Sequence, residues 1–182
     1  QKLIDNISTD EITPGWVCFY FDETLGEYSL VGLRGGKISH LAVKRGGFSV
    51  IVSGLSKGCG SSRETAPFSE LAAGIELVIA RSIEKIYGQN CQNIGLLTST
   101  DFGLIERIER GEAIPRSEFT RGLDPVAAEI VRRGGLFAYN RARLNGEVRP
   151  PEMTTAARPM TLTEKLIARH AIVDATTGAE GT

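Results

Sequence analysis

The sequence predicts an α/β domain whose parallel sheet is built from short βαβ units. Two nearly continuous apolar segments, residues 48–53 and 75–80, have the length and β-branched content of buried strands. A helical pattern follows each of them, over about residues 63–73 and 82–90. This order of strand, helix, strand and helix favours parallel strands with helices packed on the sheet.

The segments before the first βαβ unit are less regular. Residues 1–14 are polar and end in a Pro-Gly turn. Residues 16–21, W-V-C-F-Y-F, are rich in aromatic and β-branched side chains and are predicted to form a strand. Residues 25–33 are ambiguous, and the basic, glycine-rich stretch up to Gly47 is expected to form loops.

The second half of the chain is predicted to continue with one strand and several short helices. Residues 95–100 have a strand-like pattern, and apolar side chains at helical spacing follow within residues 104–108. Asp124, followed by proline, has the pattern of a helix N-cap and opens an amphipathic helix over residues 126–133. After a glycine pair, residues 136–143 are expected to form one more helical segment.

The character of the sequence changes after this predicted domain, which covers residues 1–144. Residues 145–159 are polar, contain prolines and show no periodicity, so they are predicted to be a linker. Residues 160–170 then read as an amphipathic helix, with a capping box at positions 161–164. Residues 160–182 are therefore expected to be the truncated start of a second domain.

Charge and cysteine content argue against several classes of protein. With 21 basic and 22 acidic residues the net charge is −1, so binding to nucleic acid is not expected. No apolar run approaches the roughly 20 residues that a membrane span needs. The cysteines are odd in number and far apart, and the two histidines are not spaced as a ligand pair. We expect a cytoplasmic protein in which the three cysteines, Cys18, Cys59 and Cys91, are reduced thiols. We expect no metal site within this chain.

Residues 58–64, G-C-G-S-S-R-E, lie between a predicted strand and a predicted helix. Glycines let a backbone turn sharply and approach a ligand, and a helix start favours anions. Arg63 can bind a carboxylate or phosphate through two hydrogen bonds. This pattern predicts a small-anion pocket at the carboxyl end of a strand. The alternative is a capped helix whose serines bond only its own first turn, with Arg63 on a solvated face.

Several ordered motifs resemble one family. The segments D-N-I-S-T-D-E-I-T-P, G-C-G-S-S-R-E-T-A-P, A-x-G-I-x-x-V-I-A-R-S and Q-N-I-G-L-L are similar to those of aconitase-superfamily swivel domains of the isopropylmalate dehydratase small-subunit type. The resemblance runs from Asp5 to about Asn140. It implies a swivelling β/β/α domain that lies over the active site of a larger catalytic part.

The resemblance also implies a reaction and a partner. A large catalytic subunit or domain holds a [4Fe–4S] cluster, and a 2-hydroxy acid is dehydrated and rehydrated so that its hydroxyl moves to the neighbouring carbon. Ser61 is implied as the base that removes a proton, and Ser62 and Arg63 as groups that bind a substrate carboxylate. The remaining site residues are Gly60 and Phe19 on the substrate side, with Asp5, Asp10 and Glu64 in support.

Departures from the family pattern bear on the substrate. Phe19 stands about where related enzymes choose their substrate, and an apolar side chain there favours an alkylmalate over a tricarboxylate. Thr65 replaces the family's usual histidine. The tail from Met160, M-T-L-T-E-K-L-I-A-R-H-A, resembles the opening of the large subunit. A non-catalytic anion-binding or regulatory module, or a structural interaction domain, are the alternatives to an enzyme.

Overall fold

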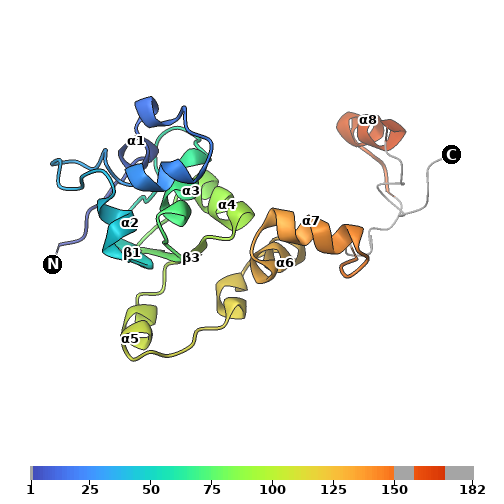
Figure 1. The fold of residues 1–182 in the computed structure, drawn as a ribbon. Coiled ribbons are helices and arrows are strands. Elements are labelled where there is room, and N and C mark those ends of the chain that lie inside the picture. Colours follow the sequence, from blue (N-terminus) through green and yellow to red (C-terminus); the bar gives the residue numbers. More distant parts are fainter. Residues whose placement is uncertain (1, 150–157, 171–182) are drawn as a thin grey trace. The chain divides into compact units, whose positions relative to one another are not determined.

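The computed structural model describes residues 2–149 and 158–170 of the chain (Figure 1). The chain divides into two units, Gln1–Glu147 and Val148–Thr182, and each is considered by itself. Within the described ranges, no helix has the length and apolar character needed to cross a membrane.

A three-stranded parallel sheet forms the centre of the first unit. Its strands are β1 (Val50–Ser53), β2 (Leu77–Ala80) and β3 (Leu97–Ser99). They lie in the order β1-β2-β3, with Val50 opposite Leu77 and Leu77 opposite Leu97. The predicted α/β class with parallel strands and intervening helices is confirmed.

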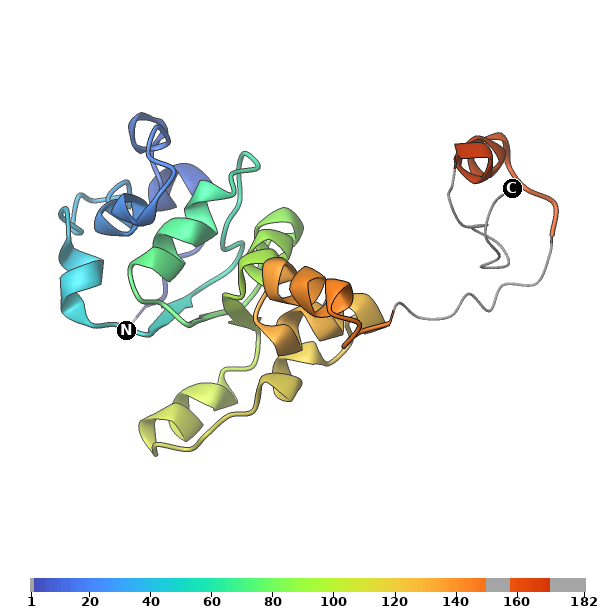
Figure 2. The ribbon, with the colours of Figure 1, turned by 45° about the vertical axis from the view of Figure 1, so that its right-hand side comes forward.

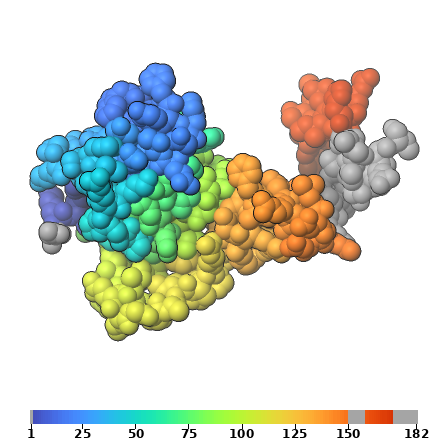
Figure 3. All heavy atoms as spheres, in the orientation of Figure 1, coloured from blue at the N-terminus to red at the C-terminus, as the bar shows by residue number. Residues whose placement is uncertain are grey.

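Short helices connect and follow these strands. The α-helices of the described residues are α1 (Thr9–Ile12), α2 (Ala42–Gly46), α3 (Thr65–Ala72), α4 (Lys85–Ile94), α5 (Gly103–Glu109), α6 (Pro125–Arg133), α7 (Leu136–Leu144) and α8 (Leu162–His170). The 3₁₀ segments are η1 (Gly15–Val17), η2 (Glu23–Tyr28) and η3 (Arg116–Thr120). Figure 3 shows the amino-terminal segments, in blue and cyan, packed against the green part of the unit.

The two faces of the central strand β2 pack against different layers. Val78 is fully buried with side chains of α3 and α4, including Ala66 and Cys91. Leu77 and Ile79 point to the other face, where Leu104 of α5 covers them. Figure 2 shows α3 and α4 on one side of the strands and α5 on the other. The continuous apolar pattern of β2 therefore reflects burial on both faces.

The strand predicted at residues 16–21 is wrong. Its backbone closes local turns instead: the N–H groups of Val17, Cys18 and Tyr20 donate to carbonyls three residues earlier. The aromatic side chains are largely solvent-facing, with Phe19 81% and Phe21 84% exposed. No neighbouring strand pairs with this segment among the described residues, so β propensity alone did not produce a strand.

Other boundaries shift for identifiable reasons. Helix α4 begins at Lys85 rather than Ser82, because Ser82 and Glu84 are hydrogen-bonded to the backbone of Lys57. The stretch expected to be loops contains η2 and α2. The predicted cap of α6 is confirmed, since Asp124 Oδ1 accepts from the N–H groups that follow it at 2.9 and 3.1 Å.

Around the predicted linker, α7 ends at Leu144 and α8 begins at Leu162. The capping box of α8 is confirmed: the Thr161 N–H donates to Glu164 Oε2 at 2.7 Å, and the Glu164 N–H donates to Thr161 Oγ1 at 3.3 Å. Residues 150–157 of the linker, and residues 171–182 of the expected second domain, lie outside the described residues.

Candidate active site

The amino-terminal segment lies along the loop that follows β1. The N–H of Asn6 donates to the Leu55 carbonyl, the N–H of Gly58 to the Ile7 carbonyl, and the N–H of Thr9 to the Cys59 carbonyl. Asp5 contributes a side chain to this contact, because its Oδ1 accepts from the Leu55 N–H at 2.7 Å. These bonds place α1 directly beside residues 58–63.

Two glycines in the loop have backbone conformations that other residues rarely adopt. Gly58 has φ of 81° and Gly60 has φ of 98°. At Gly58 the space is closed as well, because a Cβ atom there would lie 2.1 Å from Cγ of Tyr87. The loop therefore approaches α4 as closely as a glycine permits.

Replacing Gly58 by alanine is expected to destabilise the fold by about 3 kcal/mol or more, since it adds both a steric clash and an unfavourable φ. Thermal unfolding followed by circular dichroism measures the change. Gly36→Ala is the matched control: its φ is also positive, at 58°, but a Cβ would meet nothing within 4 Å. Equal melting temperatures for the two variants would contradict the expectation.

Ser61 is exposed at the tip of this loop, and Thr9 of α1 holds it. The buried Thr9 hydroxyl donates to the Ser61 carbonyl at 2.9 Å, and its oxygen lies 3.5 Å from Ser61 Oγ. A hollow of about 280 Å³ opens beside Ser61, with Ser62, Arg63 and Lys85 among its lining residues. The Ser61 hydroxyl is thus accessible to solvent, while the hydrogen bond from Thr9 fixes the Ser61 backbone.

Arg63 is fixed by α1 through both of its terminal nitrogens. Nη2 lies 2.7 Å from Asp10 Oδ1, and Nη1 donates to the carbonyl of Thr13 at 3.1 Å. The Arg63 side chain is 25% exposed and that of Asp10 60% exposed, so the guanidinium stays reachable from solvent. Of the two aspartates expected in support, Asp10 contacts Arg63 and Asp5 supports the loop after β1 instead.

A second hollow, of about 510 Å³, also borders Arg63. Cys18 and Thr65 line it, and the Cys18 Sγ lies 3.9 Å from Arg63 Nη1. Phe19 is not among its lining residues and points to solvent. The structure therefore places Cys18, rather than Phe19, against Arg63.

The loop joins α3 without a side-chain cap. Glu64 is the N-cap residue of α3 and makes no capping hydrogen bond through its side chain. Among the described hydrogen bonds, none runs from a Ser61 or Ser62 hydroxyl to the first turn of α3. The alternative in which these serines serve only as helix caps has no support in this geometry.

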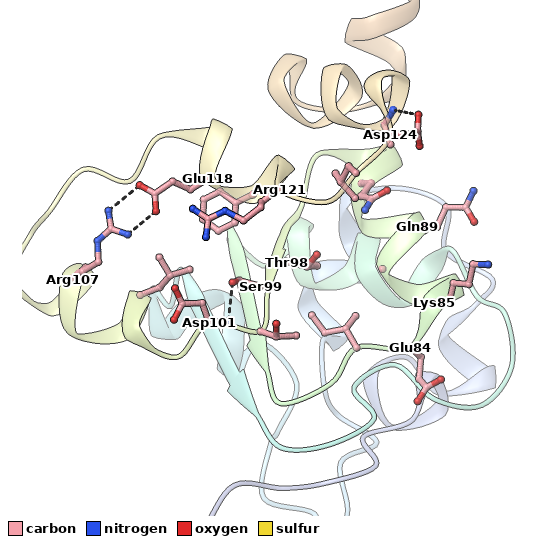
Figure 4. A pocket seen from close by; sticks show the side chains of 18 residues that line it. Glu84, Lys85, Gln89, Thr98, Ser99, Asp101, Arg107, Glu118, Arg121 and Asp124 are labelled. Atoms are coloured by element: carbon pink, nitrogen blue, oxygen red, sulfur yellow. Dashed lines mark hydrogen bonds and ion pairs between the residues drawn. The ribbon is translucent and has the colours of Figure 1, made fainter. Parts of the chain in front are cut away.

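A larger groove, of about 900 Å³, opens at the carboxyl end of β3 (Figure 4). Two of its charged side chains pair with each other: Arg107 donates to both carboxylate oxygens of Glu118, at 2.6 and 2.9 Å, which lowers the pKa of Glu118. Asp124 caps α6. The groove shares Glu84 and Lys85 with the hollow beside Ser61, but neither Ser61 nor Arg63 lines it.

Sequence analysis missed a buried cluster beneath the serine loop. Lys57 and Glu70 are both fully buried, and their charged atoms lie 2.6 Å apart. The Tyr87 hydroxyl donates to the other oxygen of Glu70. Burial, followed by the neighbouring Glu70 carboxylate, raises the pKa of Tyr87 well above its usual value. No local sequence signal marks this cluster, because its three residues lie in different segments and charged residues are ordinarily solvated.

Comparisons with known proteins point to one family. A family model of the aconitase C-terminal domain matches residues 41–100. A 3-isopropylmalate dehydratase small subunit of Nitratidesulfovibrio vulgaris is 35% identical over 162 residues, which cover 81% of this chain and 95% of the relative. The chain belongs to the 3-isopropylmalate dehydratase small-subunit family. Its members are aconitase-type hydro-lyases.

Further relatives support the family and its fold. A small subunit from Methanosarcina acetivorans is 32% identical, covering 77% of this chain and 93% of its own. A crystal structure of 3-isopropylmalate dehydratase from Methanocaldococcus jannaschii superimposes with a TM-score of 0.58 at 28% identity, over 81% of this chain and 93% of that one. An aconitase of Alternaria alternata is 34% identical over 152 residues, which make up only 18% of its length. The predicted family and its swivel-type fold are confirmed.

Within the described residues, no three Cys, His, Asp or Glu side chains converge where they could hold a metal ion. Cys18 and Cys59 are half-buried and Cys91 is buried, each as a free thiol. Burial is the main cause that raises the pKa of the Cys91 thiol.

Proposed function

We propose that this chain is the swivelling part of a [4Fe–4S] hydro-lyase that moves a hydroxyl group between neighbouring carbons of an alkylmalate such as 3-isopropylmalate. The proposal depends on one observation: Ser61 and Arg63 line the same hollow, and side chains of α1 bind both of them, Thr9 at Ser61 and Asp10 at Arg63. A weak base and a cation on one rigid support suit proton abstraction next to a carboxylate.

The chain's own residues would perform the proton transfer. Arg63, with Ser62 beside it, binds a substrate carboxylate, which places the adjacent C–H bond at Ser61. Ser61 Oγ, as an alkoxide, takes that proton, and the electrons of the C–H bond form the new carbon–carbon double bond. The hydroxyl on the neighbouring carbon departs and, with one proton, becomes water. Addition of water in the opposite sense gives the isomer.

An alkoxide at Ser61 requires stabilisation, because a serine hydroxyl is a very weak acid in water. The Arg63 guanidinium lines the same hollow and supplies positive charge. Thr9 fixes the Ser61 backbone so that little reorganisation is needed during the reaction. Gly60 leaves the loop free to adopt its φ of 98° without side-chain strain.

The family relation supports the [4Fe–4S] cluster and the catalytic partner. A [4Fe–4S] cluster, held by the large catalytic part, supplies a Lewis-acid iron for the departing hydroxyl. The substrate therefore has to lie between that part and the exposed Ser61 loop. Phe19 follows Cys18, which lines the second hollow at Arg63. We propose that Phe19 meets the alkyl group of the substrate once the catalytic part encloses the site.

We also propose that residues 160–182 begin a large-subunit-like catalytic domain, joined through a linker at 145–159. The relative from Alternaria alternata supports a fusion with further sequence in one chain, since its matching segment is 18% of a much longer chain. Helix α8 has exposed apolar side chains, Leu162 at 74% and Ile167 at 59%, which suit a helix that packs within a domain.

The test is reconstitution with the cluster-bearing catalytic part from the same genome. We expect dehydration of 3-isopropylmalate, followed by the ultraviolet absorbance of the unsaturated product, and much slower turnover of citrate. Turnover of citrate but not of 3-isopropylmalate would refute the alkylmalate assignment. Tight binding of malate or phosphate by the chain alone, without turnover in the complex, would instead identify a non-catalytic anion-binding module.

Asp10→Asn is expected to lower kcat/KM for 3-isopropylmalate by about 3- to 10-fold, because Arg63 loses the carboxylate that aims it. The melting temperature should fall by less than about 3 °C, since the Asp10 side chain is largely exposed. Glu129→Gln is the control: it weakens the ion pairs of Glu129 with Arg132 and Arg133, away from Arg63, and should leave kcat/KM unchanged. Equal kcat/KM values for the two variants would show that Asp10 does not orient Arg63 for catalysis.

A further inference from the structure

Three elements meet in the buried cluster of Lys57, Glu70 and Tyr87. Lys57 ends the segment after β1, Glu70 belongs to α3 and Tyr87 to α4. The Lys57 and Glu70 side chains have no solvent exposure, and Tyr87 is 2% exposed. Besides the ion pair, Lys57 Nζ lies 5.7 Å from the centre of the Tyr87 ring, within the range of a cation–π contact.

The cluster connects the two ends of the loop that carries Ser61, residues 58–63. At the entrance, the Lys57 N–H donates to the Ser82 carbonyl at 3.0 Å, and the Lys57 carbonyl accepts from the Glu84 N–H at 2.9 Å. Gly58 follows at once and touches the Tyr87 ring. At the exit the loop enters α3, which carries Glu70. One set of side-chain bonds therefore fixes the distance between the two ends of the loop that carries Ser61.

Stability alone does not account for such a cluster. Removing two charges from water is costly, and apolar side chains of similar volume often replace a buried ion pair without loss of stability. The Glu70 carboxylate, however, accepts from both Lys57 Nζ and the Tyr87 hydroxyl, and these directional bonds constrain the three side chains more than non-directional apolar contacts would. The value of the cluster therefore lies in geometric precision.

We infer that the Lys57–Glu70–Tyr87 cluster is the positioning element of the Ser61 loop: it holds the loop entrance against α4 and so sets where Ser61 Oγ meets the substrate. Lys57 and Glu70 are positioning residues, because their ion pair is fully buried. Tyr87 borders the hollow beside Ser61 but is only 2% exposed, and it has the same role because its hydroxyl donates to Glu70 and its ring packs against Gly58. The inference rests on the proposed function for its kinetic readout, and not for its structural one.

The experiment separates positioning from stability with two variants. Lys57→Met/Glu70→Leu/Tyr87→Phe makes the cluster apolar at similar volume, and its melting temperature should lie within about 5 °C of wild type. Lys57→Met alone leaves Glu70 without its cation and should lower the melting temperature by roughly 10 °C. In the reconstituted enzyme, we expect the triple variant to lose kcat by about 10-fold or more, with KM within a factor of about three.

A structural readout is taken on the chain without its partner. Hydrogen exchange of the amides of Lys57, Gly58 and Glu84 should speed up about 10-fold in the triple variant, because these amides tie the loop entrance. Amides of α5, which packs on the opposite face of the sheet from α3 and α4, serve as the internal control. Faster exchange at these three amides without any turnover by wild-type enzyme would support positioning and refute the proposed function.

Tyr87→Phe keeps the inference testable where the triple variant folds poorly. It removes only the hydroxyl that donates to Glu70 and keeps the ring that packs on Gly58. We expect kcat to fall about 3-fold or more, with faster exchange of the Gly58 amide. Wild-type kcat together with wild-type exchange, in either variant, would show that the cluster only fills space and would overturn the inference.

Discussion

Ser61→Ala is expected to lower kcat of the reconstituted enzyme by roughly 10³-fold or more, the largest effect of any single substitution at the site. The change removes the only atom proposed to take the proton. KM should change little, since Arg63 and Ser62 remain to bind the carboxylate. Dehydration of 3-isopropylmalate under saturating substrate measures the effect.

The fold should not contribute to this loss. The Ser61 side chain is exposed, and the bond that holds this residue runs from Thr9 to the Ser61 carbonyl, which alanine also has. The melting temperature should therefore stay within about 2 °C of wild type. Ser117→Ala, at another exposed serine far along the chain, is the matched control and should keep full activity. If Ser61→Ala retains more than about a tenth of wild-type kcat, Ser61 is not the base.

Much of the fold follows from local patterns in the sequence. The apolar segments around β1 and β2, and the Asp124-Pro125 start of α6, depend on residues that are neighbours along the chain. The aromatic run at residues 16–21 shows where this reasoning fails. A strand needs a partner, and there the chain forms local turns, with Phe21 left 84% exposed.

The candidate site divides in the same way. The loop with Ser61 and Arg63 was found from its own residues and from its resemblance to a family. Asp10 was expected in support, and it does contact Arg63. Thr9 was not predicted, because it lies 52 residues before Ser61 in sequence. A capping box at Ser8 and Glu11 was the local sign that a helix begins there. The Lys57–Glu70 pair gave no such sign, because two charged residues are expected to be solvated until their packing is known.

Arg63→Met is expected to lower kcat/KM by about 10²- to 10³-fold, and Arg63→Lys by about 10- to 100-fold. Methionine removes the charge, whereas lysine keeps it and loses the planar pair of donors that matches a carboxylate. Lysine also cannot hold Asp10 and the Thr13 carbonyl in the way that the two terminal nitrogens of Arg63 do. Steady-state kinetics on 3-isopropylmalate measure both variants, and Arg132→Lys, in an exposed ion pair, is the control.

How the loss divides between kcat and KM shows what Arg63 does. A carboxylate anchor alone raises KM and leaves kcat unchanged, because it binds substrate and transition state equally. A group that also stabilises the Ser61 alkoxide lowers kcat, since that charge forms only on the reaction path. Because Arg63 and Ser61 line the same hollow, we expect both changes, with kcat falling by about 10-fold or more in Arg63→Met. An unchanged kcat would confine Arg63 to binding and would require another source of stabilisation. Lys85, the other cation that lines the hollow, is the candidate.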